Sequence, residues 1–250
     1  MRLPILKDFS LGPVPLREGL SLDNAAAINR ARERGTVVAV VGNGKGGCGK
    51  STLAMNAAIG FVRQGRRVLV IDADAEQQTI VKWRRSAVSP NPEVAACEPA
   101  AIVEVLARRI GDADAVLIDL PGRDVHALAQ VLDCADILIS PAKPSRQDLS
   151  ELGRFVRAAQ ARKCPHVVVF NEATRESTEE MIGLRAEFAE FGPFLPIAIQ
   201  QISSYRRIYG YGRGVLDIRP PNPARANFEK VFPTISAAIE RAHELRMARS

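Results

Sequence analysis

A glycine-rich loop between a β-branched run and a helical run constrains this chain more than any other feature. The run TVVAVV (residues 36–41) leads directly into GNGKGGCGKST, and LAMNAAIGFVRQG follows. The spacing Gly-x4-Gly-Lys-Ser over Gly44–Ser51, between a strand and a helix, is the pattern of a phosphate-binding P-loop. The glycines let backbone N–H groups curl around a phosphate, and the helix adds its partial positive N-terminus. The chain is therefore expected to bind a nucleotide by its phosphates.

Two lysines in this loop carry the chemistry. Lys50 is expected to reach the β- and γ-phosphates, and the Ser51 hydroxyl to bind Mg²⁺, so ATP and Mg²⁺ are the expected cofactors. Lys45 adds a second positive charge where one nucleotide already has Lys50 and a magnesium ion, and a phosphate of a facing subunit would be a suitable partner for it. The expected phosphate site comprises Gly44, Lys45, Gly46, Gly47, Cys48, Gly49, Lys50, Ser51 and Thr52.

Beyond the loop, short apolar runs alternate with helical patterns. This alternation is typical of a parallel sheet covered by helices on both faces. It predicts the α/β class: a doubly wound, mostly parallel sheet of the P-loop NTPase type, forming one domain over residues 36–250. Residues 1–35 are expected to be an N-terminal extension or arm, with a short helix that is capped near Ser21 or Asp23 and ends at Gly35. The expected strands are 36–41, 67–71, 115–118, 137–140 and 167–170, and the expected helices 50–63, 100–110, 125–132, 147–161, 178–188 and about 224–246.

The amino-acid composition places only weak limits on where the protein is located and on what it binds. The formal charge of +6 is compatible with an acidic partner such as nucleic acid or anionic lipid. The four cysteines form no Cys-x-x-Cys pair, so neither a zinc site nor a disulfide framework is indicated. No run reaches the roughly 18 apolar residues of a membrane span, and the N-terminus lacks the apolar run of a signal peptide. A cytoplasmic protein with reduced thiols is expected.

Four segments, in order, resemble the ParA/MinD family of ATPases. Lys45–Ser51 is similar to the family's deviant Walker A motif, and the segment from Val70 to Asp74, followed by Gln77-Gln78, is similar to its Asp-x-Asp-Pro-Gln segment, although Ala75 replaces the proline. Val116–Asp119 with Pro121-Gly122 resembles the Walker B strand and turn, and Ala135–Ser145 the next strand and loop. The resemblance covers about residues 36–170, and the last 80 residues match only in layout.

The resemblance implies roles for residues around the loop. Lys45 would cross a dimer interface to the partner's nucleotide, which makes Lys45, Lys50 and Asp74 the catalytic candidates. Asp74 matches the carboxylate that positions the attacking water; an acidic cap on the following helix is the alternative. Asn171 matches the asparagine that reads adenine, although an asparagine that ends a strand also suits a turn. The metal candidates are Ser51, Asp72 and Asp119.

The same resemblance implies an ATP-dependent homodimer with slow hydrolysis, since no arginine finger is evident near these segments. Family members use the dimer to bind an extended surface and release it when a partner protein, ParB-like or another cargo adaptor, stimulates hydrolysis. In its short length and in the presence of Trp83, the chain resembles the small ParA-like partition proteins. The arginines of the segment 203–225 would bind DNA without sequence preference, unless they form an ordinary solvated cluster. The DNA candidates are Arg206, Arg207, Arg213 and Arg219.

The expected function is an ATP-dependent partition ATPase that is associated with the nucleoid. A MinD-like protein bound to membrane is an alternative, but the C-terminal helical stripe is rich in alanine and better suited to packing on the sheet, so a membrane partner is not favoured. A metabolic P-loop ligase is a second alternative. An iron–sulfur reductase and a tyrosine kinase are disfavoured, because Cys97 and Cys134 lack a glycine-rich setting and the tail ERAHELRMARS has no tyrosine.

Overall fold

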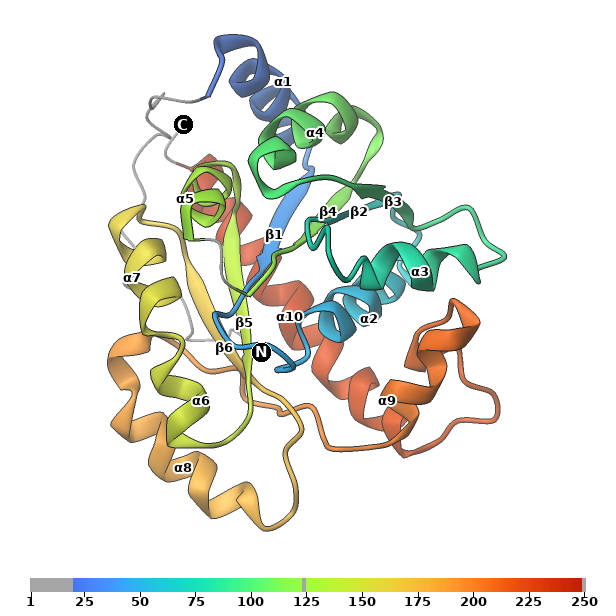
Figure 1. Ribbon diagram of the computed structural model, residues 1–250, viewed down its shortest axis with the longest axis vertical. Coiled ribbons are helices and arrows are strands. Elements are labelled where there is room, and N and C mark those ends of the chain that lie inside the picture. Colours follow the sequence, from blue (N-terminus) through green and yellow to red (C-terminus); the bar gives the residue numbers. More distant parts are fainter. Residues whose placement is uncertain (1–19, 123–124, 249–250) are drawn as a thin grey trace.

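A six-stranded sheet runs through the centre of the computed structural model, which describes residues 20–122 and 125–248 (Figure 1). The strand order is β3-β2-β4-β1-β5-β6, and every pairing between these strands is parallel. The predicted α/β class with a doubly wound parallel sheet is confirmed. The strands are β1 (Val37–Val41), β2 (Val68–Asp72), β3 (Glu93–Ala96), β4 (Ala115–Asp119), β5 (Ile137–Ala142) and β6 (His166–Phe170).

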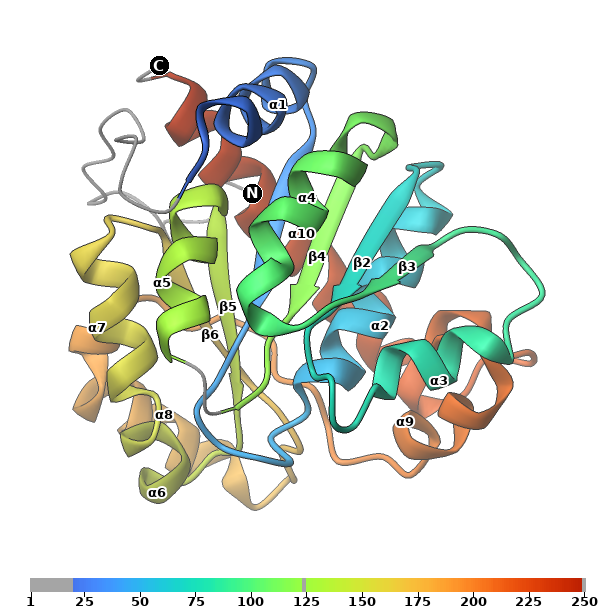
Figure 2. The ribbon, with the colours of Figure 1, turned by 45° about the horizontal axis from the view of Figure 1, so that its top comes forward.

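Helices cover both faces of the sheet. Alternate side chains of β1 enter two different cores: Val37 and Ala39 pack with α2 and α10, whereas Val38 and Val40 pack with α1, α4, α5 and α7. Figure 2 shows these two sets of helices on the two faces of the sheet. This two-sided burial explains why the central strands read as continuous apolar runs. The helices are α1 (Leu22–Glu33), α2 (Lys50–Arg63), α3 (Thr79–Arg85), α4 (Ile102–Arg109), α5 (Val125–Cys134), α6 (Arg146–Ser150), α7 (Gly153–Ala161), α8 (Ser177–Glu187), α9 (Ser204–Arg207) and α10 (Pro223–Met247).

Several elements differ from the sequence-based expectation, and α9 is a further helix that was not expected. Strand β3 was not expected, because this edge strand is short and partly exposed. The helix expected over 147–161 is two helices, α6 and α7, and Ser145 caps the first by accepting a hydrogen bond from the backbone N–H of Asp148. Helix α3 was also not expected, and its N-terminus is held by a carboxylate from the preceding strand, as described below. No helix of the described residues is long and apolar enough to cross a membrane.

Helix α1 is integrated into the domain, although residues 1–35 were expected to form an appendage. Its Ile28 and Ala31 are buried in the same core as α4, and Arg32 is buried beside Asp136, with 3.5 Å between its Nε and the carboxylate. Burial alone would raise the pKa of Asp136, but Arg32, His243 and Arg246 together hold it below its usual value. A boundary at residue 35 would cut through this cluster. Residues 1–19 of the expected arm lie outside the described residues.

Candidate functional site: a phosphate-loop cavity

A cavity of about 510 Å³ opens at the carboxyl ends of the central strands. The register places the ends of three strands side by side, because Val41 of β1 pairs with Asp119 of β4, and Asp119 pairs with Asp72 of β2. Ligands of open α/β sheets bind at this edge. The predicted residues that line the cavity are Gly46, Gly47, Gly49, Lys50, Ser51, Thr52, Asp74 and Asn171, and Arg206 joins them.

The loop before α2 has the glycine geometry that a phosphate cradle requires. Gly47 and Gly49 have φ values of 72° and 94°, which side chains rarely tolerate. A Cβ atom on Gly49 would lie 2.1 Å from the Nδ2 atom of Asn171. That Nδ2 atom donates a 2.8 Å hydrogen bond to the carbonyl of Cys48. Asn171 therefore supports the loop itself, a role that was not predicted for it.

Asn43 is a further loop support that the sequence did not reveal. Its Oδ1 atom accepts a hydrogen bond from the backbone N–H of Lys45 (2.9 Å), and its Nδ2 atom donates to the carbonyl of Pro141 (2.7 Å). The side chain is fully buried. It links the phosphate loop to the end of β5, a contact across 98 residues that the local motif does not encode.

The two lysines of the loop are held within the subunit. The Nζ atom of Lys50 donates to the carbonyl of Lys45 over 3.1 Å, so it stays inside the loop. The Nζ atom of Lys45 donates to Oδ2 of Asp148 on α6 over 2.6 Å. The Asp148 side chain is only 6% exposed, and its Oδ2 atom also accepts from the hydroxyl of Ser145. Asp148 is thus a partner of the second lysine that no motif had indicated.

Asp119 has the properties of a cation ligand. It is fully buried at the end of β4, and its Oδ1 atom has no hydrogen-bond partner among the described residues. Burial raises its pKa to about 7, the nearby charges of Asp72 and Asp74 add to this, and the Ser51 hydroxyl and Lys50 oppose it. An unpaired buried carboxylate is costly unless a cation completes it. Asp119 and Ser51 therefore fit Mg²⁺.

The described residues hold no cluster of three or more His, Cys, Asp or Glu side chains that would bind a metal unaided. Magnesium commonly keeps several waters and takes one or two protein ligands together with substrate phosphates. The donor set of Asp119 and Ser51 suits a Mg²⁺ ion that arrives with a nucleotide. This arrangement would neutralise charge on the phosphates.

Asp72 was predicted to support the metal through water, which stays a prediction; in the structure its carboxylate accepts hydrogen bonds from backbone N–H groups. Its Oδ2 atom accepts from the N–H groups of Ile80 (2.9 Å) and Val81 (3.1 Å), and its Oδ1 atom accepts from that of Asp74 (3.2 Å). These bonds lower the pKa of Asp72, but its burial outweighs them and raises it. Asp72 thereby caps α3 and orders the loop before it.

Asp74 lines the cavity and is only partly buried. Its Oδ1 atom accepts from the backbone N–H of Gln77 (2.9 Å) within the turn, so it does not cap α3. Its position on the cavity wall suits the predicted role toward an attacking water, which remains a prediction.

The predicted DNA-binding arginines lie on α9 and the turns after it. Arg206 is on the cavity wall with 3.5 Å between its guanidinium and Glu172. Arg207, Arg213 and Arg219 are exposed, and the described part of the chain provides no acidic partner for them within ion-pair distance. Three exposed cations without a partner are available for an anion.

A comparison with protein families decides the classification. Residues 39–213 match the family model described as the CobQ/CobB/MinD/ParA nucleotide binding domain. The chain belongs to this family. The match extends well past the segments quoted from the sequence and includes the arginine-rich turns up to Arg213.

Relatives within the family support this placement. The chain is 31% identical to the maintenance of carboxysome distribution protein A of Gloeobacter kilaueensis, over 78% of this chain and 91% of the relative. It is 24% identical to protein ParA of Rhizobium radiobacter, over 84% and 95%. Among solved structures, the cell division ATPase MinD of Pyrococcus furiosus is 18% identical with a TM-score of 0.64, over 80% of this chain and 98% of MinD. The fold is therefore that of a ParA/MinD-type nucleotide-binding ATPase.

Proposed function

We propose that this chain is a ParA-type ATPase whose ATP-bound homodimer binds DNA without sequence preference and positions a cargo. The observation that carries the proposal is the second lysine of the loop. Lys45 is not needed beside Lys50 for one nucleotide, and its side chain in the phosphate loop is 31% exposed, so a facing subunit could meet it. A lysine so placed can join two subunits through ATP.

Each residue of the cavity has a task in this proposal. Lys50 binds the β- and γ-phosphates, and Asp119 and Ser51 hold the magnesium that neutralises them. Asp74 orients the attacking water and accepts its proton. Asn171 holds the loop under the nucleotide and lines the part of the cavity expected to receive the base. Lys45 is bound to Asp148, and Arg206, the arginine among the described residues that line the cavity, lies 3.5 Å from the carboxylate of Glu172. Because neither cation is free for the phosphates, turnover by a lone subunit is expected to be slow.

The names of the relatives support a positioning role. One acts in carboxysome distribution by its name, and another is called ParA. We infer that the dimer travels on the nucleoid and that a cargo adaptor, ParB-like or unrelated, stimulates hydrolysis and so releases it. The identity of the cargo does not enter the argument.

A MinD-like membrane role is the second candidate, and the packing of α10 counts against it. Ile235, Ile239 and Ala242, which form the apolar stripe of this helix, are buried against the sheet. A membrane-surface helix needs this stripe exposed to lipid. A metabolic ligase is disfavoured by Lys45, since a single-subunit ligase has no facing nucleotide for this lysine.

Co-sedimentation with random-sequence duplex DNA, in the presence of Mg²⁺ with ATP or with ADP, tests the proposal. We expect binding with ATP that falls steeply with salt, and weak binding with ADP. Analytical ultracentrifugation of the same samples should show a dimer with ATP only. Equal DNA binding in both nucleotide states, or binding only to anionic vesicles, would refute the DNA-positioning role.

A further inference from the structure

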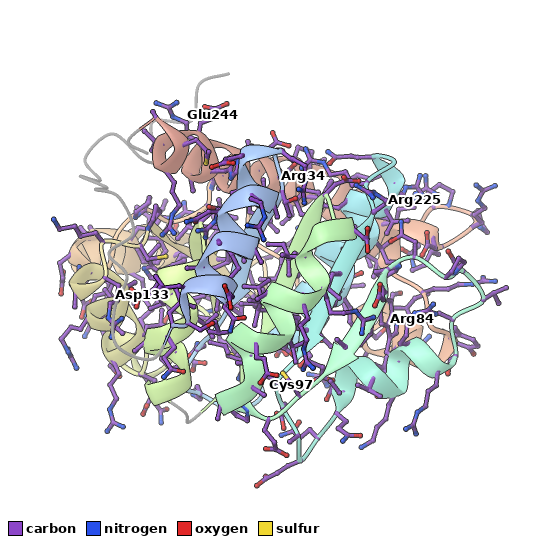
Figure 3. The ribbon with its side chains drawn as sticks, turned by 90° about the horizontal axis from the view of Figure 1, so that it is seen from above. Arg34, Arg84, Cys97, Asp133, Arg225 and Glu244 are labelled. Carbon is purple, nitrogen blue, oxygen red and sulfur yellow. The ribbon has the colours of Figure 1, made fainter. Side chains whose placement is uncertain are left out.

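Two basic segments that are far apart in the sequence lie together at one edge of the molecule. Helix α3 has Lys82, Arg84 and Arg85 in its last turn. Helix α9 ends with the exposed Arg207, and the turns after it contain the exposed Arg213 and Arg219. Both views of the ribbon place α3 beside α9, and Figure 3 shows Arg84 at this edge (Figures 1–3).

Two contacts tie these segments to each other. The Nε1 atom of the buried Trp83 donates a 3.1 Å hydrogen bond to the carbonyl of Arg213. Gly212, with a φ of 60°, lies so close that a Cβ atom there would be 2.3 Å from the backbone nitrogen of Ala87. The end of α3 and the arginine-rich turns are therefore packed directly against each other.

The other end of α3 is tied to the nucleotide cavity. Asp72 accepts hydrogen bonds from Ile80 and Val81, and the loop between Asp72 and α3 supplies Asp74 and Gln77 to the cavity wall. A nucleotide that contacts this loop thus acts on a seven-residue helix whose far end holds the arginines. Helix α3 alone spans the distance between the two places.

We propose that α3 and residues 206–219 form a single composite surface for the phosphates of duplex DNA, and that Trp83 is the positioning residue that sets this surface according to the bound nucleotide. The inference rests on the proposed function and deepens it. It assigns Arg84 and Arg85 to DNA binding, in addition to the arginines expected from the sequence.

DNA fits this surface better than a lipid membrane does. Arginine guanidinium groups bind phosphate oxygens in pairs and need no apolar contact. Membrane-surface binding requires a continuous apolar face. Among the described residues of this surface, Val88 and Tyr211 are the strongly exposed large apolar side chains, and two side chains do not make such a face. The alternative explanation for the cations of α3 is purely structural: they would stabilise the C-terminus of the helix through its dipole.

The double variant Arg84→Gln/Arg85→Gln tests the surface, because glutamine keeps the helix propensity while removing both charges. We expect the affinity for random-sequence duplex DNA with ATP to fall on the order of tenfold, and the slope of log affinity against log salt to decrease by about two. The matched control is Arg154→Gln/Arg157→Gln, two exposed arginines on α7 near the opposite edge of the sheet, which should leave both values unchanged.

Trp83→Phe tests the coupling, since phenylalanine retains an aromatic ring but cannot donate to Arg213. We expect the ratio of DNA affinity with ATP to that with ADP to fall by about fivefold, corresponding to one lost hydrogen bond of about 1 kcal/mol. ATP binding and ATP-dependent dimerisation should stay as in the wild type. Gly212→Ala, which forces the two segments apart, should reduce the same ratio even if Trp83→Phe proves poorly folded.

The outcomes separate the two proposals. If the wild type binds no DNA in either state, or binds only vesicles of phosphatidylserine and phosphatidylcholine, the proposed function and this inference both fall. If the wild type binds DNA with ATP and the Arg84/Arg85 variant matches it, the composite surface alone is refuted. If both Trp83→Phe and Gly212→Ala keep the wild-type affinity ratio, the coupling through α3 is refuted.

Discussion

The ion pair between Lys45 and Asp148 should oppose dimerisation, so its removal should strengthen the dimer. In the single subunit the two groups are 2.6 Å apart, and the acid is almost completely buried. A lysine that is to reach a partner's nucleotide must first leave Asp148. Asp148→Asn removes the charge, while the backbone N–H at position 148 still bonds to Ser145 and so keeps the start of α6.

The size of the effect follows from the exposure of the two side chains. Hydrogen bonds to charged groups contribute about 1.5–3 kcal/mol, whereas fully exposed ion pairs contribute about 0–1 kcal/mol. With Lys45 31% exposed and Asp148 6% exposed, about 1.5 kcal/mol per subunit is a reasonable value. A symmetric dimer breaks two such pairs, about 3 kcal/mol, which corresponds to a roughly 100-fold lower dimer Kd.

Sedimentation velocity over a range of protein concentrations, with Mg²⁺ and a non-hydrolysable ATP analogue, measures this constant. Asp114→Asn is the matched control, because it breaks the ion pair with Arg67 at 2.7 Å, at the end of the sheet away from the cavity. The control should dimerise like the wild type. An unchanged or weaker dimer for Asp148→Asn would show that Lys45 does not have to leave Asp148, and the reasoning would be wrong.

Three further predictions concern the cavity and the core. Gly49→Ala should abolish ATP binding in calorimetry, because its Cβ would lie 2.1 Å from the Nδ2 atom of Asn171 and φ is 94°; micromolar binding by this variant would contradict the loop geometry. Asp74→Ala should retain ATP binding but stop turnover in a phosphate-release assay, and undiminished hydrolysis would refute its role toward water. Burial lowers the pKa of His166 to about 4, so the unfolded state gains a proton first as the pH falls below about 6.5. The free energy of unfolding should therefore drop by about 3 kcal/mol more by pH 4 than it does in His166→Gln. Urea unfolding of both proteins at pH 7 and pH 4 checks this, and equal losses would contradict it.

The sequence predicted those parts of the site that are encoded locally. Gly44–Ser51 lies between a strand and a helix, so the phosphate loop could be recognised within a dozen residues. The central strands could be placed because burial on both faces makes them continuously apolar. Asp119 could be placed at the carboxyl edge of the sheet because it ends such a strand.

Contacts across long sequence distances could not be predicted in this way. The partner of Lys45 is 103 residues away, and nothing in the segment around Asp148 marks it as buried. The polar sequence around Arg32 indicates a solvated side chain, yet in the structure this arginine is buried and forms an ion pair with Asp136. Strand β3 is stabilised by pairing with β2 and not by its own apolar pattern. These features depend on the folded arrangement of several elements.

The carboxylates of Asp72, Asp74 and Asp119 have different contacts, and these contacts link the cavity to α3. Asp119 is buried with an unpaired oxygen, which suits a cation, and Asp74 stands on the cavity wall, which suits a water. Asp72 pairs with Asp119 in the sheet register, and it accepts hydrogen bonds from the backbone of α3 and from the N–H of Asp74. Burial is the main cause of the raised pKa of both Asp72 and Asp119, and the charge of Asp74 adds to both, so the three carboxylates lie close enough to sense one another's charge. Asp72 accepts hydrogen bonds from α3, and Trp83 of α3 donates one to the arginine-rich turns. The same strand end therefore contacts both the candidate nucleotide site and the surface proposed to bind DNA.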